Sequence, residues 1–335
     1  MKVQILIDNI AGHVGDAISA DAGPANKCAA QGERTRKLFG EWGLSVYVEY
    51  DGHKVLLDTG ASHLFAKNAN VMGIDLSQVD IGVLSHAHYD HANGMAKFFA
   101  LNKTAPFYLR KGAGENCYHT HKLFGRFSYH EYIGIHKGWL ERFAGRIRYA
   151  EGNAEIAPGI TLVPHSTTGL ERIGEMAHLS VKENGKYRYD SFDHEQSLVF
   201  DASKGLFVMN SCSHGGADNI VKEIEATFPG KKIYAILGGF HLFRYKDEVV
   251  RAFAERLRGL LAVFDEMFRL AVARPDRLVA VPRATQADLG GHDDFLARSL
   301  PRVERLTHQL LAGLLLLARS VVGPCGVDVA ATRIQ

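Results

Sequence analysis

Residues 85–94 read Ser-His-Ala-His-Tyr-Asp-His-Ala-Asn-Gly and place three histidines and one aspartate within six positions. A mostly apolar run precedes them and predicts a buried strand that ends at this cluster. His86 and His88 lie two positions apart, so on extended backbone both imidazoles leave the same face and can bind one ion. Asp90 and His91 follow where the chain turns, which can bring an oxygen and a third nitrogen to an adjacent ion. The pattern favours metal binding over a chance group of surface histidines.

Four other stretches place an aspartate or a histidine beside an apolar run. They are Val55–Gly60 (VLLDTG), Asp193–Leu198 (DHEQSL), Asn210–Gly216 (NSCSHGG) and Leu237–Leu242 (LGGFHL). Together with residues 85–94, these stretches resemble the metallo-β-lactamase superfamily. They resemble in particular the branch of the 7,8-dihydropterin-6-ylmethyl-4-(β-D-ribofuranosyl)aminobenzene 5'-phosphate synthases and their uncharacterised bacterial relatives. The resemblance extends over residues 1–250.

Strand and helix patterns alternate along these residues. Asp51-Gly52 predicts a tight hairpin turn between two alternating apolar segments. Strands are expected at 1–7, 43–50, 54–57, 79–84, 146–149, 160–163, 178–181, 197–200, 205–209 and 233–237, and helices at 62–72, 92–101 and 217–228. Strand pairs with tight turns and intervening helices fit two sheets sandwiched between helices. With the resemblance, this predicts an α/β protein, a four-layer αββα sandwich of two mixed β-sheets flanked by helices.

An insert at residues 111–145 interrupts this domain, which is expected to cover residues 1–250. It is rich in histidine and aromatic residues. One interpretation is a lid or wall over the site, whose aromatic rings stack on a flat or ring-bearing substrate. The other is a partly exposed helical insert whose aromatic residues are ordinary core. None of its histidines is assigned as a metal ligand.

Residues 251–335 differ in composition from the rest of the chain. No lysine occurs after Lys246 and no tyrosine after Tyr245, while arginine and leucine become frequent. The resembling branch carries a late Gly-His-Cys-Thr-Gly turn whose histidine is a metal ligand, and nothing here matches it. We therefore expect an atypical helical C-terminal segment that is not homologous to the family's own.

The composition limits which binding partners and which cellular compartment can be expected for this protein. The chain has 335 residues, 46% of them apolar and 23% charged, and a net charge of +2, which gives no reason to expect nucleic acid or an anionic membrane as partner. Its four cysteines, at positions 28, 117, 212 and 325, are too far apart for a disulfide framework. The most hydrophobic run, residues 310–318, is well short of the ~20 residues that a membrane helix needs. A soluble, cytoplasmic protein with reduced thiols is expected.

The resemblance implies a pair of divalent metal ions at one edge of the sheets. Nitrogen and carboxylate ligands suit zinc, with iron or manganese as alternatives. The expected ligands are His86, His88 and His194 for the first ion, and Asp90, His91 and His241 for the second.

Two further residues receive roles from the resemblance. In much of the superfamily an aspartate bridges the two ions at the strand end where this chain has His214. Imidazole bridges metals less readily than carboxylate does, so His214 is expected either to bind one ion or to act from outside the coordination sphere. Asp58 is expected to hold the histidine loop by hydrogen bonds.

This ligand set predicts a metal-dependent hydrolase. A water between two ions ~3.5–4 Å apart loses a proton near neutral pH and becomes the nucleophile, with Asp90 to orient it as the catalytic residue. The ions also hold the charge that develops on the substrate oxygen. This chemistry suits hydrolysis of an ester, lactone or phosphoester in a small-molecule substrate.

Two alternatives stay open. The resemblance implies a synthase or transferase that joins a pterin diphosphate to a ribofuranosylaminobenzene phosphate and releases diphosphate, so the substrate would be phosphorylated and pterin-like. The missing late histidine favours a third interpretation, a metal-binding protein without catalysis. The sequence predicts no oligomeric state.

Overall fold

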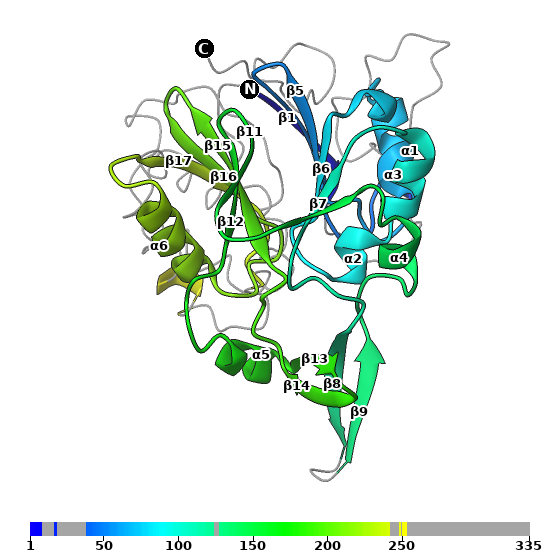
Figure 1. Ribbon diagram of the computed structural model, residues 1–335, viewed down its shortest axis with the longest axis vertical. Coiled ribbons are helices and arrows are strands. Elements are labelled where there is room, and N and C mark those ends of the chain that lie inside the picture. The colour runs from blue at the N-terminus through cyan, green and yellow to red at the C-terminus, as the bar shows by residue number, and fades with distance from the viewer. Residues whose placement is uncertain (9–16, 19–37, 124–126, 242–247, 249, 253–335) are drawn as a thin grey trace, which may run out of the picture.

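The computed structural model describes residues 1–8, 17–18, 38–123, 127–241, 248 and 250–252. Within these residues, two large mixed sheets face each other (Figure 1). Helices α1 (Leu64–Val71) and α3 (Met95–Leu101) lie outside the first sheet, and α6 (Ala217–Thr227) lies outside the second. The layers therefore run helix, sheet, sheet, helix, which confirms the predicted αββα sandwich.

The first sheet joins an antiparallel half to a parallel half. Its strands, in spatial order, are β1 (Lys2–Ile7), β4 (Ser45–Tyr50), β5 (His53–Leu57), β6 (Ile81–Val83), β7 (Phe107–Arg110) and β10 (Ile147–Ala150). Neighbours from β1 to β5 are antiparallel and those from β5 to β10 are parallel. The predicted turn between β4 and β5 is confirmed, since Asp51 and Gly52 have φ of +46° and +82°, as a two-residue hairpin requires.

The second sheet has the strand order β11 (Ala154–Ala157), β12 (Ile160–Pro164), β15 (Gln196–Ala202), β16 (Gly205–Met209) and β17 (Ile233–Leu237). Only the last pair, β16 and β17, is parallel. These two strands therefore deliver the loops that follow them, residues 210–216 and 238–241, to the same edge of the sheet.

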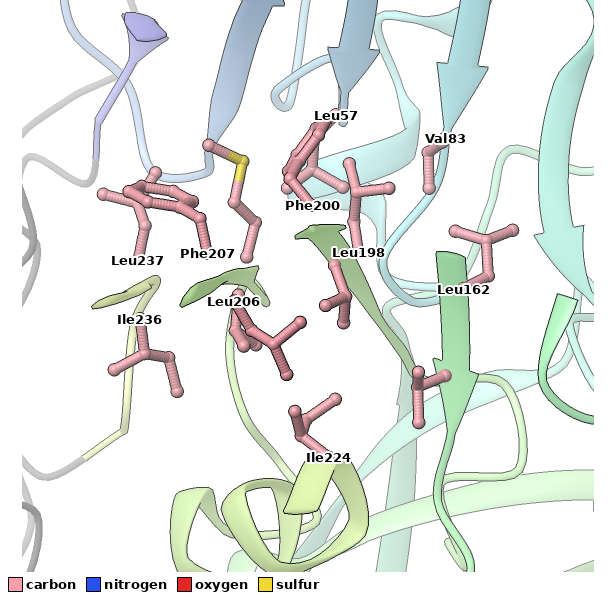
Figure 2. Packing of buried hydrophobic residues seen from close by; sticks show 14 of the residues in the cluster. Leu57, Val83, Leu162, Leu198, Phe200, Leu206, Phe207, Ile224, Ile236 and Leu237 are labelled. Atoms are coloured by element: carbon pink, nitrogen blue, oxygen red, sulfur yellow. The ribbon is translucent and has the colours of Figure 1, made fainter. Parts of the chain in front are cut away.

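Alternation of side chains along the strands builds two cores. Val46 and Val48 of β4 point between the sheets, whereas Tyr47 points to the other side, toward α1 and α3. Figure 2 shows Leu57 of the first sheet facing Phe200 of the second, with Ile224 of α6 on the opposite side of the second sheet. The strand ends are fixed by this packing, so the loops beyond them are held in place.

Shorter elements complete the described chain. They are β2 (Ala17–Ile18), β3 (Leu38–Phe39), the 3-10 helix η2 (Leu76–Gln78), α2 (Tyr89–Ala92), α4 (Trp139–Arg142) and α5 (Glu171–Ala177). The one-turn helix α2 begins directly after His88 and carries the aspartate and third histidine of the motif. The helix predicted at 92–101 corresponds to α3, which begins at Met95, and the short helix α2 before it was not predicted.

The insert forms a β-hairpin rather than helices. Strands β8 (Cys117–Leu123) and β9 (Phe127–Tyr132) pair with each other, and β8 also pairs with β13 (Leu179–Glu183), which pairs with β14 (Lys186–Tyr189). This four-stranded sheet projects below the sandwich in Figure 1. The helical alternative for residues 111–145 is therefore wrong, apart from the four residues of α4.

The base of the hairpin contacts the histidine loop directly. The amide of Tyr89 donates to the carbonyl of Ile133 over 2.8 Å, and His88 forms an isolated antiparallel bridge with Gly134. The insert thus contacts the segment that carries the histidines, and its role as a lid or wall over the site stays a prediction.

The expected C-terminal segment, residues 251–335, lies almost wholly outside the described residues, and the assignment of residues 1–250 to one domain stays a prediction. Among the described helices, none has the length and apolar character to span a bilayer.

Candidate metal centre

Three histidines from two sheets meet at one point. His86 and His88 follow β6, and His214 follows β16. The centroids of their rings lie 4.6 Å (His86 to His88), 4.9 Å (His86 to His214) and 4.7 Å (His88 to His214) apart. Their possible ligand atoms all lie within 4.8 Å of one another. This is a spacing at which one ion can contact all three rings.

The Nε2 atoms of these three histidines are buried, and none has a hydrogen-bond partner. An unpaired buried nitrogen is unfavourable by roughly 1–3 kcal/mol, so three in one place are an arrangement that a bound cation would relieve. Burial lowers the pKa of each imidazole, and nearby histidines lower it further, to about 3 for His88. All three are therefore neutral at physiological pH, which is the form that binds metals.

Asp58 forms hydrogen bonds with the loop that carries His86. One of its carboxylate oxygens accepts the amide of Ser85 over 2.7 Å, and the other accepts the Ser85 hydroxyl over 2.7 Å. Because that hydroxyl gives its proton to Asp58, it accepts from Nδ1–H of His86, 2.8 Å away. The proton on Nδ1 leaves Nε2 of His86 as the nitrogen with a free lone pair. Asp58 thus contacts the histidine loop through Ser85, and its role in metal binding stays a prediction.

The second part of the site surrounds His91. Its Nδ1 lies 2.8 Å from Oδ2 of Asp58, and its Nε2 lies 3.3 Å from Oδ2 of Asp90 and 3.2 Å from Sγ of Cys212. Burial would raise the pKa of Asp90, but the charges of His91 and His88 and a hydrogen bond from His91 lower it to about 2. Asp90 is thus an ionised carboxylate beside the His91 ring.

The ring centroid of His241 lies 4.5 Å from that of His214. Ligand atoms of Cys212, His214 and His241 lie within 4.8 Å of one another, as do those of His86, His91 and Cys212. Cys212 thus belongs to two groups, although the sequence analysis assigned it no role beyond that of an unpaired thiol. Its position two residues before His214, in the stretch that carries the resemblance, was the available signal.

His194 occupies a different environment from the one expected. Its Nδ1 accepts the amide of Ala87 over 3.2 Å, and its Nε2 lies 2.9 Å from Oδ2 of Asp190. It forms a separate group with His88, Cys117 and Asp190. The structure therefore brings His214, rather than His194, together with both His86 and His88. In this arrangement His194 contacts the peptide between these two histidines.

A buried charge network holds the loop that carries His214. Glu195 accepts the amides of His214 and Gly215 over 2.9 and 2.8 Å. His165 lies between this carboxylate and that of Glu223, with nitrogen–oxygen distances of 2.6 and 2.9 Å. Burial would lower the pKa of His165, but its hydrogen bonds to Glu195 and Glu223 raise it to about 9. His165 is thus a cation between two carboxylates.

Comparisons with known proteins agree with this fold. The family model described as the metallo-beta-lactamase superfamily matches residues 43–177. The crystal structure of Tm1679, described as a metal-dependent hydrolase of the beta-lactamase superfamily, superposes with a TM-score of 0.58 and 29% identity, over 78% of this chain and 84% of that one. The chain is thus similar to proteins of the metallo-β-lactamase superfamily in sequence and in fold.

Two known protein sequences indicate which branch of the superfamily this chain resembles. The 7,8-dihydropterin-6-methyl-4-(beta-D-ribofuranosyl)-aminobenzene-5'-phosphate synthase of Methanocaldococcus jannaschii is 25% identical over 240 residues, which cover 67% of this chain and 78% of the synthase. The uncharacterized protein MJ0448 of the same organism is 25% identical over 229 residues, which cover 67% of this chain and 82% of that protein. The chain is thus similar to the branch that its sequence motifs indicate.

Proposed function

We propose that this protein is a metal-dependent hydrolase that cleaves an ester, lactone or phosphoester bond in a small molecule. The observation that carries the proposal is the group of three buried histidines with unpaired Nε2 atoms. The similarity to the metallo-β-lactamase superfamily supports the same interpretation, because the fold resembles that of Tm1679, which is described as a metal-dependent hydrolase.

The described side chains fit a pair of divalent ions, with zinc favoured by the nitrogen and carboxylate donors. His86, His88 and His214, whose ligand atoms lie within 4.8 Å of one another, would hold the first ion. Asp90 and His91, which lie 3.3 Å apart, would contribute to the second ion. His241, which groups with His214 and Cys212, is proposed as a further ligand of that ion. Such ions would supply positive charge to polarise a substrate oxygen and to activate water. His194 has contacts on both ring nitrogens, so we assign it the role of holding the Ala87 peptide.

The chain's own residues prepare the site for this chemistry. The ionised carboxylate of Asp90 would accept a hydrogen bond from the attacking water and orient it toward the substrate. Asp58 fixes the tautomer of His91 through Nδ1, which leaves Nε2 as the nitrogen that faces Asp90. Because these groups are buried, their charges act in a low-dielectric environment where they are strong.

A second candidate is a synthase. It is favoured by the similarity to the M. jannaschii synthase over 240 residues. In that reaction a bond would form between the pterin methylene carbon and the aminobenzene substrate, and the carbon–oxygen bond to diphosphate would break. The same cluster would then stabilise the departing diphosphate instead of positioning water.

Turnover assays on the metal-loaded protein separate these functions. Hydrolysis of generic phosphoesters or lactones supports the hydrolase, whereas diphosphate release that requires a pterin substrate supports the synthase. If the protein binds metal but turns over neither kind of substrate, it is a metal-binding protein without catalysis. Asp90→Asn is expected to keep the circular dichroism spectrum and to lower the rate by about 10²-fold or more. The control is Asp51→Asn, in an exposed turn whose positive φ asparagine tolerates.

The free thiols of Cys117 and Cys212 are consistent with a reducing compartment, so the proposal includes a cytoplasmic location.

A further inference from the structure

We propose that Asp190 is a positioning residue for the first ion, since its carboxylate is connected to all three histidines that would bind that ion. The inference rests on the metal centre proposed above, although it does not depend on which reaction that centre performs. Asp190 lies in the turn between β14 and β15 and is almost completely buried. Two separate chains of contacts lead from its two oxygens to the three imidazoles.

The first connection passes through His194 to the histidine loop. Oδ2 of Asp190 lies 2.9 Å from Nε2 of His194, and Nδ1 of His194 accepts the amide of Ala87 over 3.2 Å. Because Nδ1 is an acceptor here, the neutral ring carries its proton on Nε2 and donates it to the carboxylate. Asp190 thus fixes the tautomer that holds Ala87. The peptide of Ala87 in turn sets the relative placement of His86 and His88.

The second connection passes through Phe192 to His214. Oδ1 of Asp190 accepts the amide of Phe192 over 2.8 Å. The ring of Phe192 is fully buried and lies parallel to that of His214, with an interplanar angle of 8° and a centroid distance of 5.4 Å. This is the offset stacking that aromatic rings prefer, and it limits rotation of the imidazole. The same carboxylate therefore acts on the third histidine through a ring contact.

The backbone at Phe192 is strained. Its φ is +56°, in the left-handed region that bulky side chains rarely adopt. Such a conformation persists only where surrounding contacts enforce it, and these positions cluster at functional sites. The contacts here are the bond from the Phe192 amide to Asp190 and the bond from the Glu195 amide to the Phe192 carbonyl, 2.9 Å long. The strain therefore supports a positioning role for the ring rather than a passive place in the core.

The main chain of Asp190 is held independently of its carboxylate. A Cβ at Gly174 of α5 would lie 2.3 Å from the carbonyl oxygen of Asp190, so the two segments pack closely. The amide of Asp190 donates to the carbonyl of Leu179 over 3.1 Å. Leu179 and Phe192 also belong to one small apolar cluster with Leu170. A substitution that alters only the carboxylate therefore tests its two hydrogen bonds and leaves the packing of the turn in place.

The test compares Asp190→Asn with Asp193→Asn in the full-length protein. Asparagine has one acceptor oxygen in place of two, so it can accept from Phe192 or from His194 but not from both. We expect Asp190→Asn to bind zinc or cobalt(II) at one site at least about tenfold more weakly than wild-type protein does, measured by chelator competition. Asp193→Asn changes an exposed carboxylate in the same turn and should leave the affinity unchanged.

The visible spectrum of bound cobalt(II) separates positioning from a general loss of stability. Its ligand-field bands depend on the arrangement of the donors around the ion. At saturating cobalt they should be displaced in Asp190→Asn and unchanged in Asp193→Asn. Phe192→Leu keeps an apolar side chain but removes the ring stacked on His214, so it should displace the bands as well. This variant decides the question if Asp190→Asn does not fold.

Three results would overturn the proposal. If the affinity and the bands of Asp190→Asn match those of wild-type protein, Asp190 does not position the histidines, while the proposed metal centre survives. If Phe192→Leu leaves the bands unchanged and Asp190→Asn loses an ion outright, Asp190 is itself a ligand, in the group that it forms with His88, Cys117 and His194. If wild-type protein binds neither zinc nor cobalt, the metal centre fails and the positioning role fails with it.

Discussion

Oδ2 of Asp58 lies 2.8 Å from Nδ1 of His91, and both side chains are completely buried. These residues are 33 positions apart and follow different strands of the first sheet. A carboxylate on one imidazole nitrogen fixes the tautomer and directs the other nitrogen toward a metal. Asp58, which directly follows β5, thereby orients His91, a proposed ligand of the second ion.

Asp58→Asn should weaken metal binding without unfolding the protein. The amide cannot accept a charge-assisted bond from His91 and from Ser85 at once, so the orientation of Nε2 is no longer enforced. We expect a 10–100-fold loss of affinity for one of the two ions, measured by competition with a chelator. Asp75→Asn, on an exposed turn, is the control. Equal affinities in the two variants would show that Asp58 has no part in metal binding.

His88→Ala should abolish binding of the first ion. It removes one of three converging nitrogens, and two imidazoles hold a divalent ion much less tightly than three do. Elemental analysis of the purified variant is expected to show at least one ion fewer per chain than in wild-type protein. His63→Ala removes an exposed histidine and should change nothing. Undiminished metal content in His88→Ala would refute the assignment.

The charge network at His165 predicts a pH-dependent stability. The folded-state pKa is about 9, against an ordinary value of 6.5, so the folded protein holds this proton more tightly than the unfolded chain does. The resulting stabilisation, roughly 2–4 kcal/mol, is fully present below about pH 6.5 and is lost as the pH rises through about 9.

Urea denaturation near pH 7 and near pH 10 measures this effect. His165→Gln carries no titrating group, so its stability should fall by a smaller amount than that of the wild type over the same interval. Parallel losses in the two proteins would mean that His165 is neutral in the fold.

Gly215→Ala should displace the loop that carries His214. A Cβ at this position would lie 2.4 Å from the ring of His165, which its two carboxylate partners hold in place. We expect a destabilisation of about 1–3 kcal/mol and weaker metal binding, by denaturation and chelator competition. Gly145→Ala is the matched control, because a Cβ there would meet nothing within 4 Å. A variant as stable as this control would exclude a tight fit between Gly215 and His165.

Much of the fold followed from local patterns. The alternation in β4 and β5, the Asp51-Gly52 turn and the helix α6 depend on residues a few positions apart, so the chain specifies them directly. The hairpin in the insert was not predicted, because β8 takes a second partner, β13, from about sixty residues further along the chain. Pairing between strands so far apart in the sequence depends on the tertiary structure, which overrides the local propensity of the residues.

The sequence by itself determined that histidines and an aspartate would gather after the strands, because strand periodicity and the spacing of residues 85–94 are local properties. Only the tertiary structure decided which side chains share a centre. His194 and His214 both lie next to strands of the second sheet, yet His214 joins His86 and His88 while His194 turns toward Asp190. That choice, like the place of Cys212, depends on how two sheets pack and on loop conformations such as the positive φ of Ser213, and neither can be read from spacing along the chain.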